Sequence, residues 1–280
     1  FTIAMTFDSD IKEYVEKTTP CLHILSICDD DSCHVQYTTS LMGTLSICKQ
    51  YGVNVSVIFH NTDSCVPRAR NNLIAKSMSN PNITHMMLID TNIQWNPYDV
   101  LKMLLNNKMI VGGICPNTHY AWEKIIQTES MENVCKQLRE KNPHIIPPNI
   151  PNDEIIQNRI MNYSVAIRDG PLTVEDNVTD VDQFGLGFVL IHRRVIETLQ
   201  QAFPSTFYRD STAFLKTDEE KKHAYALFEQ VVENGEFLTQ DEVFCRRWKN
   251  VGGAIYANIT LQLNRIGSHK FNGQFLRSII

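Results

Sequence analysis

Few features of this sequence point to a membrane or to nucleic acid. No apolar run approaches the roughly 20 residues that a membrane-spanning helix needs, and the first segment, FTIAMTFDSDIKEY, lacks the basic n-region and long apolar h-region of a secretory signal. The net charge is −5, and the 26 Lys and Arg residues are dispersed without long basic runs. We therefore expect a globular chain without a membrane span and without a nucleic-acid partner.

Several familiar catalytic motifs are also missing. The sequence contains no HExxH pair, no GxSxG nucleophile motif, and no second CxxC to complete a zinc site beside Cys28, Cys33 and His34. Eight cysteines are present, and Cys28, Cys48 and Cys115 lie in or beside apolar runs, which favours reduced core thiols. A cytoplasmic location is favoured, while the absence of an initiator methionine also allows a lumenal domain of a larger protein.

Four short β-rich runs alternate with segments of helical spacing in the first half of the chain. The runs are residues 21–27, 53–59, 85–90 and 109–115. Alternation of this kind predicts a parallel sheet covered by helices. A repeat of about 30 residues per strand and helix fits a nucleotide-binding, doubly wound half.

The second half is less regular. Residues 123–180 include KNPHIIPPNIPNDEI, with four prolines, which predicts a connecting loop. Strands are expected in NYSVAI (162–167) and in QFGLGFVLI (183–191), followed by helices from Arg193, over KKHAYALFEQVVENG (221–235), and from Thr239. The glycine pairs of FGLGF and VGG indicate either a close approach of ligand and backbone or a bulge. Both halves are expected to share one sheet.

The third β-rich run stops abruptly at Asp90, which is followed by Thr91 and Asn92. Ligands of open α/β sheets bind at the carboxyl ends of the strands, so Asp90 is placed where a ligand would be, although an acid at a strand end can also be a turn cap. Arg68 and Arg70 fall in the first turn of the preceding helix, where they could hold a diphosphate or form a solvated face.

Four sequence blocks, in order, resemble GT-A glycosyltransferases. They are RARNNLIAKSM, THMMLIDTNIQWNPYDVLKMLLNNKMIVGGICP, DQFGLGFVLIHRRVIETL and TQDEVFCRRWKNVGGAIYANITLQLNRIGSHKFNG. The resemblance is to the small enzymes of large DNA viruses and phages and, more distantly, to fungal Anp1-type mannosyltransferases. It implies one large α/β domain with a GT-A-like (Rossmann-like), mainly parallel central sheet flanked by helices.

The resemblance also implies that successive segments of the chain have different roles. Residues 1–20 would be an N-terminal extension, 21–122 the nucleotide-sugar-binding half, 123–180 a connecting or acceptor-side segment, and 181–280 the acceptor-binding and catalytic half. The expected reaction moves a sugar from a nucleoside diphosphate sugar, with a UDP-sugar as the expected donor, to a hydroxyl of a glycan or glycoprotein. The expected donor-binding residues are Asp63, Arg68, Arg70, Asp90, Asn92 and Arg265.

In that family an acid-x-acid motif holds Mn²⁺ or Mg²⁺ against the diphosphate, and this chain departs from it. The second acid is Asn92, which offers oxygen without charge, and Arg265 stands where relatives tend to have a histidine. One interpretation is weakened metal binding by Asp90, Asn92 and His269. The other is catalysis without a metal, in which Arg265 replaces the charge of the ion.

The resemblance makes Asp241 the candidate general base. Its plainer interpretation is helix capping, because Thr239 and Glu242 form a capping-box pattern around it. Two other functions stay open: a catalytically weakened GT-A domain that serves as a binding or scaffold module, and a nucleotidyltransferase. The latter would require a glycine-rich loop after the first strand, where SICDDDSCH is acidic instead.

Overall fold

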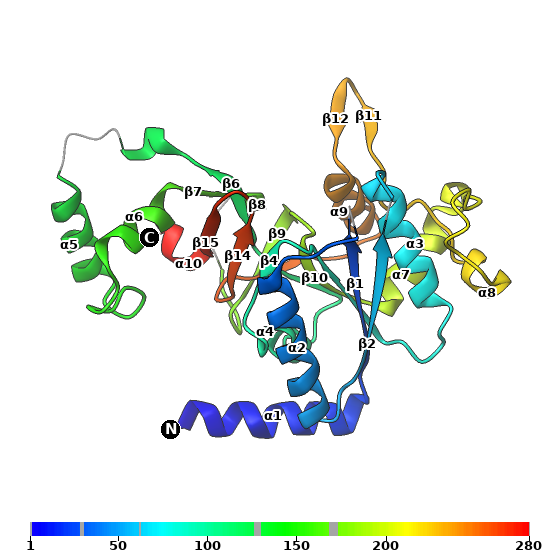
Figure 1. Ribbon diagram of the computed structural model, residues 1–280, viewed down its shortest axis with the longest axis horizontal. Helices are drawn as coiled ribbons and strands as arrows, with labels where there is room; N and C mark the ends of the chain where they lie inside the picture. Colours follow the sequence, from blue (N-terminus) through cyan, green and yellow to red (C-terminus); the bar gives the residue numbers. More distant parts are fainter. Residues whose placement is uncertain (1, 29–30, 62, 126–129, 168–172, 280) are drawn as a thin grey trace.

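A large mixed sheet runs through the protein, with helices on both of its faces (Figure 1). The computed structural model describes residues 2–28, 31–61, 63–125, 130–167 and 173–279. Within these residues the main sheet has eight strands in the order β2-β1-β3-β10-β5-β13-β9-β8. The strands are β1 (Cys21–Cys28), β2 (Asn54–Asn61), β3 (His85–Ile89), β5 (Ile110–Gly113), β8 (Val165–Ile167), β9 (Val178–Phe184), β10 (Phe188–His192) and β13 (Tyr256–Asn258).

The other elements are helices and three small sheets. The helices are α1 (Thr2–Thr18), α2 (Val35–Gln50), α3 (Val66–Met78), α4 (Asp99–Leu105), α5 (Met131–Lys141), α6 (Asn152–Ile160), α7 (Arg193–Ala202), α8 (Asp218–Lys221), α9 (Gln240–Asn250) and α10 (Phe275–Ser278), with short 3₁₀ turns at Trp122–Ile125 and Pro204–Thr206. The small sheets join β4 (Ile93–Gln94), β14 (Gln262–Ile266) and β15 (Lys270–Gln274); β6 (Pro116–Tyr120) and β7 (Met161–Tyr163); and β11 (Val231–Glu233) and β12 (Glu236–Leu238).

All four β-rich runs of the first half lie in the main sheet as predicted. β1 pairs in parallel with β2 and β3, and β5 points the same way as β3 because β10 lies antiparallel between them. The sheet is mixed but mostly parallel, because β10 and β9 run against the direction that the other strands share. Because β10 comes from the second half of the chain, the two halves form a single α/β domain.

The two faces of the sheet bury alternate residues of each strand. On β3, Met86 and Leu88 join a cluster that includes α3, α7 and α9, whereas Met87 and Ile89 join a second cluster that includes α1, α2 and α4. A strand that is buried on both faces reads as a continuous apolar run, which explains the unbroken Met-Met-Leu-Ile sequence before Asp90. The result is a helix-sheet-helix sandwich.

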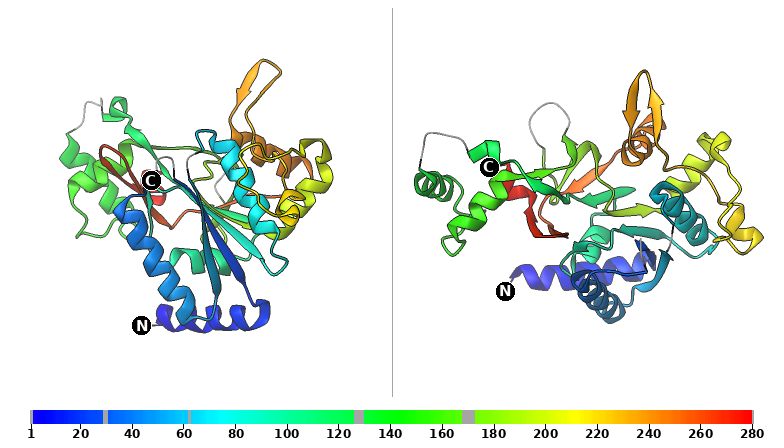
Figure 2. Two further views of the ribbon diagram at one scale, coloured as in Figure 1. Left: turned by 45° about the vertical axis from the view of Figure 1, so that its right-hand side comes forward. Right: turned by 45° about the horizontal axis from the view of Figure 1, so that its top comes forward.

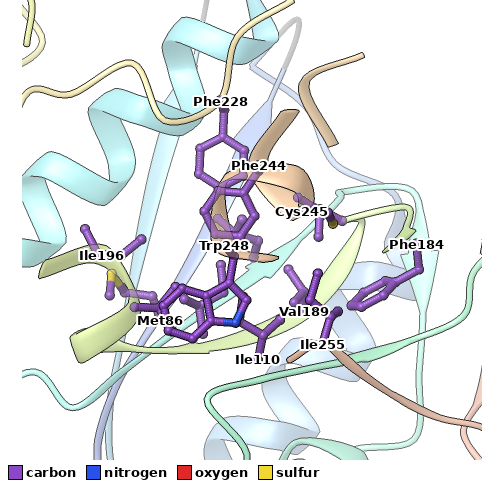
Figure 3. Packing of buried hydrophobic residues seen from close by; sticks show 14 of the residues in the cluster. Met86, Ile110, Phe184, Val189, Ile196, Phe228, Phe244, Cys245, Trp248 and Ile255 are labelled. Carbon is purple, nitrogen blue, oxygen red and sulfur yellow. The ribbon is translucent and has the colours of Figure 1, made fainter. Parts of the chain in front are cut away.

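Aromatic rings hold α9 in the first cluster, where Phe244 stacks on a ring from the segment after α8 (Figure 3). Phe228 and Phe244 stack with ring centroids 4.3 Å apart, and Trp248 lies one turn further along α9. A Cβ at Gly253 would lie 2.0 Å from the Trp248 ring, so only glycine fits against this indole. This packing sets the position of the first turn of α9, which carries Asp241.

Helix α1 packs against the rest of the domain. α1 lies across the base of the sheet (Figure 1), where Ile11 is fully buried in the second cluster. The Tyr51 hydroxyl donates a hydrogen bond to Asp8, and Phe7 contacts the rings of Tyr51 and Tyr98 edge-on. These contacts tie α1 to the ends of α2 and α4.

Helices α5 and α6, together with the β6–β7 pair, form a lobe at the side of the sheet opposite α3, α7 and α8 (Figures 1 and 2). Cys135, Ile146 and Ile155 form a small core of their own between α5 and α6. The predicted strand at 162–167 is divided into β7 and β8, which pair with β6 and β9 respectively. Among the described residues, no helix is both long and apolar enough to cross a membrane.

The helix predicted over residues 221–235 is wrong. After α8 ends at Lys221, the chain continues in turns and bends and then enters the β11–β12 hairpin, which projects from the body of the protein (Figure 1). The apolar residues of this segment are nevertheless buried, since Ala224, Leu227 and Phe228 are 1%, 1% and 0% exposed. These side chains are thus buried without a helix.

Candidate functional site

A polar pocket of about 570 Å³ opens at the carboxyl ends of β1 and β3. Its walls come from elements far apart in the sequence: the segments after β1 and β3, the first turns of α3 and α9, the turn between β9 and β10, and β14. This is the position at which open α/β sheets bind ligands. Of the predicted residues, the pocket brings together Arg70, Asp90, Asn92, Asp241 and Arg265.

Arg70 is the centre of the site. Its Nη1 donates to Asp241 Oδ1 at 2.6 Å and its Nη2 donates to Asp90 Oδ1 at 3.2 Å. The Arg70 side chain is only 6% exposed. Burial lowers the pKa of Arg70, but the two neighbouring carboxylates outweigh burial and keep that pKa above its ordinary value. Arg70 therefore stays charged and links the two acids.

Asp241 occupies the first turn of α9. Thr239 and Glu242 form the predicted capping box around this helix start, so the local sequence fixes the turn that presents Asp241. The Oδ2 atom of Asp241 also accepts a hydrogen bond from the Leu186 backbone nitrogen at 3.1 Å. Because a carboxylate oxygen can accept more than one hydrogen bond, and the Asp241 side chain is 28% exposed, a hydroxyl in the pocket can still reach it.

Arg265 reaches Asp90 from the other side. β14 pairs antiparallel with β4, with Arg265 opposite Ile93, and this pairing carries the guanidinium to the end of β3. Its Nη2 lies 3.7 Å from Asp90 Oδ2. A Cβ on Gly187 would lie 2.6 Å from Asp90 Oδ2 and 3.2 Å from Arg265 Nη2, so the second glycine of FGLGF marks a close approach of side chains at this point.

Asp63 and Arg68 lie elsewhere. Arg68 donates to Asp63 through Nε at 3.0 Å and through Nη2 at 2.7 Å, and the Arg68 bond lowers the pKa of Asp63. Asp63 also accepts from the Cys65 backbone nitrogen at 2.9 Å, just before α3 begins. The pair lines a separate cavity of about 420 Å³ that also includes Lys76. The structure therefore does not bring Asp63 and Arg68 to Asp90.

The expected metal ligands are not assembled. His269 lies in the turn between β14 and β15, where its Nε2 is 3.4 Å from the Tyr120 hydroxyl, and it does not line the pocket of Asp90. Asn92 Oδ1 is buried and has no hydrogen-bond partner within the described residues. The part of the chain that the structure describes contains no cluster of three or more His, Cys, Asp or Glu side chains suited to a metal.

The charges of the pocket also disfavour a dication. The two carboxylates, Asp90 and Asp241, are already balanced by the guanidinium groups of Arg70 and Arg265. A hard divalent cation binds through anionic and carbonyl oxygens, and here the amide oxygen is buried while the carboxylate is paired twice. The residues present do not fit Mn²⁺ or Mg²⁺, and we derive no chemical step through either ion.

A second polar pocket, of about 600 Å³, adjoins the first. Both pockets are lined by Ser164, Gly185, Gln240 and Asp241, so Asp241 lies where they meet. The second pocket adds the polar side chains of Gln183, Gln230, Thr239 and Glu242. Sequence reasoning read Thr239 and Glu242 only as a capping box and did not single out Gln183 or Gln230, because these elements meet only in the folded chain.

Cys115, which the sequence places beside an apolar run, also lines the first pocket. Burial raises the pKa of its thiol to about 12, so Cys115 remains protonated near neutral pH and is not a nucleophile. Asn117 and Ser164 complete this wall, with Ser164 Oγ donating to Asn117 Oδ1 at 2.8 Å.

No protein-family model matches the chain, and the curated proteins give no match. Among solved structures, the crystal structure of A197 from STIV is similar to this chain with a TM-score of 0.43 and 13% sequence identity. The superposition covers 88% of this chain and 86% of that chain. This structural resemblance is distant.

Proposed function

We propose that this protein is a GT-A-like glycosyltransferase that moves a sugar from a nucleoside diphosphate sugar, with a UDP-sugar as the first candidate, to a hydroxyl group of a glycan or glycoprotein. The observation that carries the proposal is the position of Asp241. It lies at the meeting point of two polar pockets and is linked through Arg70 to the acid at the end of β3. A carboxylate between a donor and an acceptor can take the proton that the acceptor hydroxyl loses.

The first pocket suits the donor. A nucleoside diphosphate is anionic, and Arg265 together with the amino terminus of α3 supplies positive potential at the pocket wall. The volume of about 570 Å³ lies within the range of pockets that hold cofactor-sized ligands. Asp90 lies between the two arginines, where it orients both guanidinium groups.

The second pocket suits a hydroxyl-rich acceptor. Its glutamine, threonine and glutamate side chains offer donors and acceptors of hydrogen bonds, which sugar hydroxyl groups can satisfy in either direction. An acceptor placed there would direct a hydroxyl group to Asp241 and, beyond it, to the donor.

The proposed reaction is a direct displacement. The acceptor oxygen attacks the anomeric carbon and its proton passes to Asp241, while the bond between that carbon and the diphosphate oxygen breaks. The products are the glycosylated acceptor and a nucleoside diphosphate, which leaves with the bonding electron pair. Positive charge from Arg265 stabilises the charge that develops on the leaving diphosphate.

The proposal is tested with Asp241→Asn in an assay that follows release of nucleoside diphosphate from a panel of nucleotide sugars. Loss of the base should slow release by on the order of 10²-fold while nucleotide binding stays nearly unchanged. Glu233→Gln, the same change of acid to amide at a side chain that lines neither pocket, is the matched comparison and should lose far less activity. Equal rates for wild type and Asp241→Asn would contradict the assigned base.

A binding or scaffold module is the second candidate, and one observation favours it. Arg70 already occupies an oxygen of each carboxylate, as expected for a site that binds a ligand without turning it over. Such a module would bind nucleotide sugars in calorimetry but would release no nucleoside diphosphate from any of them, with or without acceptor sugars.

A further inference from the structure

The two arginines of the pocket differ in what they can offer a ligand. Arg70 donates to both acids at 2.6 and 3.2 Å and is almost fully buried. Arg265 is more exposed, at 24%, and lies 3.7 Å from Asp90, which is an ion-pair distance but too long for a hydrogen bond. Arg70 is therefore engaged within the protein, whereas Arg265 still has donors to give.

The donor atoms of Arg265 confirm this difference. Its Nε is buried and has no hydrogen-bond partner within the described residues. An unsatisfied donor beside a polar pocket is costly, and a planar fork of donors matches two oxygens of a phosphate. Since Nε itself is buried, the Nη atoms of this 24% exposed side chain are the donors left for an anionic ligand in the pocket.

The same arrangement works against a divalent cation. An ion bound to Asp90 would lie between Arg70 and Arg265, both positively charged, and would meet their repulsion at short range. The second expected ligand of the cation, Asn92 Oδ1, is buried. The backbone carbonyl of Asn92 accepts a hydrogen bond from the Ile266 nitrogen at 2.7 Å. That bond holds β14 against the end of β3 and thereby keeps Arg265 in place.

We infer that Arg265 binds the diphosphate directly and supplies the charge of a divalent cation, so that nucleoside diphosphates bind here without metal. Arg70 is a positioning residue that keeps Asp90 and Asp241 in place and does not contact the phosphates. The inference rests on the proposed function, because it assumes that the ligand of this pocket carries a diphosphate.

The test is calorimetric titration with UDP, GDP, ADP and CDP, each in EDTA and again in Mn²⁺, together with a titration of Mn²⁺ alone. We expect at least one nucleotide to bind with a dissociation constant that differs by no more than about twofold between the two conditions. Arg265→Gln should weaken that binding roughly 10- to 100-fold in EDTA, since it removes a charge-assisted contact. Arg265→Lys keeps the charge but lacks the planar fork of donors, so its affinity for the nucleotide should lie between those of the wild type and Arg265→Gln.

Arg246→Gln is the matched control. Arg246 is half-exposed on α9 and pairs with Glu233 outside the pocket, so it reports the loss of one surface charge without a change in the site. It should bind nucleotide as the wild type does. Thermal melting of each variant shows whether it is folded, and the comparison of wild type in EDTA and Mn²⁺ needs no variant at all.

The outcomes separate the inference from the proposed function. Nucleotide binding that appears only with Mn²⁺ would overturn metal-free recognition and leave a glycosyltransferase in place. Binding in EDTA that is unchanged in Arg265→Gln would also overturn the inference, because another residue would then hold the diphosphate. If no nucleotide binds in either condition, the proposed function fails together with the inference.

Discussion

Replacement of Arg70 by methionine should destabilise the protein through the two acids that it leaves behind. Methionine keeps much of the apolar stem of the side chain but removes both ion pairs, to Asp90 and Asp241. Breaking a fully buried ion pair costs roughly 3–5 kcal/mol. Since the two carboxylates are 35% and 28% exposed, water screens them in part, and we expect a loss of about 2–3 kcal/mol.

Urea unfolding followed by circular dichroism near neutral pH measures this loss. The double variant Arg70→Met with Asp241→Asn also removes one of the two carboxylates left unpaired. Its loss in free energy of unfolding should therefore be smaller than the sum of the two single losses by about 1 kcal/mol or more. Arg246→Met, which loses an exposed pair, should change stability by no more than about 0.5 kcal/mol. Strict additivity of Arg70→Met and Asp241→Asn would refute the view that Arg70 acts by holding these acids.

Two further predictions concern the neighbourhood of the site and the base of the sheet. Gly187→Ala should cost roughly 1–3 kcal/mol in urea unfolding, because its Cβ would meet Asp90 Oδ2 at 2.6 Å, whereas Gly267→Ala, with its nearest atom at 3.9 Å, should be nearly neutral; equal effects would rule out the contact. Burial and His192 lower the pKa of His85 to about 3 from 6.5, so below pH 6.5 the unfolded chain binds a proton that the folded chain does not. The contribution of neutral His85 to the free energy of unfolding is therefore fully present above pH 6.5 and should fall by up to about 2 kcal/mol at about pH 5. A similar fall in His85→Gln would show that another group is responsible.

The sequence by itself determined the local structure and one edge of the site. Apolar runs and helical spacing predicted β1, β2, β3 and β5 and the helices between them, because periodicity records which faces a segment must bury. The capping box at Thr239 predicted the start of α9, and the abrupt end of the third strand placed Asp90 at the edge of the sheet where the first pocket opens. These features depend on neighbours in the chain, so they can be read from it.

The conformation of residues 221–235 shows where local reading fails. The spacing of Ala224, Leu227 and Phe228 looks helical, yet the side chain of Asn71 bonds both the nitrogen and the carbonyl of Phe228 at 3.0 and 2.7 Å. These two bonds satisfy the backbone of Phe228 without a helix, while Phe228 stacks on Phe244. A distant residue thus overrides a local preference.

Only the tertiary structure decided which charges meet. Arg68 and Arg70 lie two positions apart on one helix, but Arg68 turns to Asp63 while Arg70 reaches Asp90 and Asp241. The insertion of β10 between β3 and β5 and the pairing of β14 with β4 bring Gly187 and Arg265 to the same acid. Such contacts depend on strand order and on helix rotation, which are set by the packing of the whole core, and no pattern within a single segment records them.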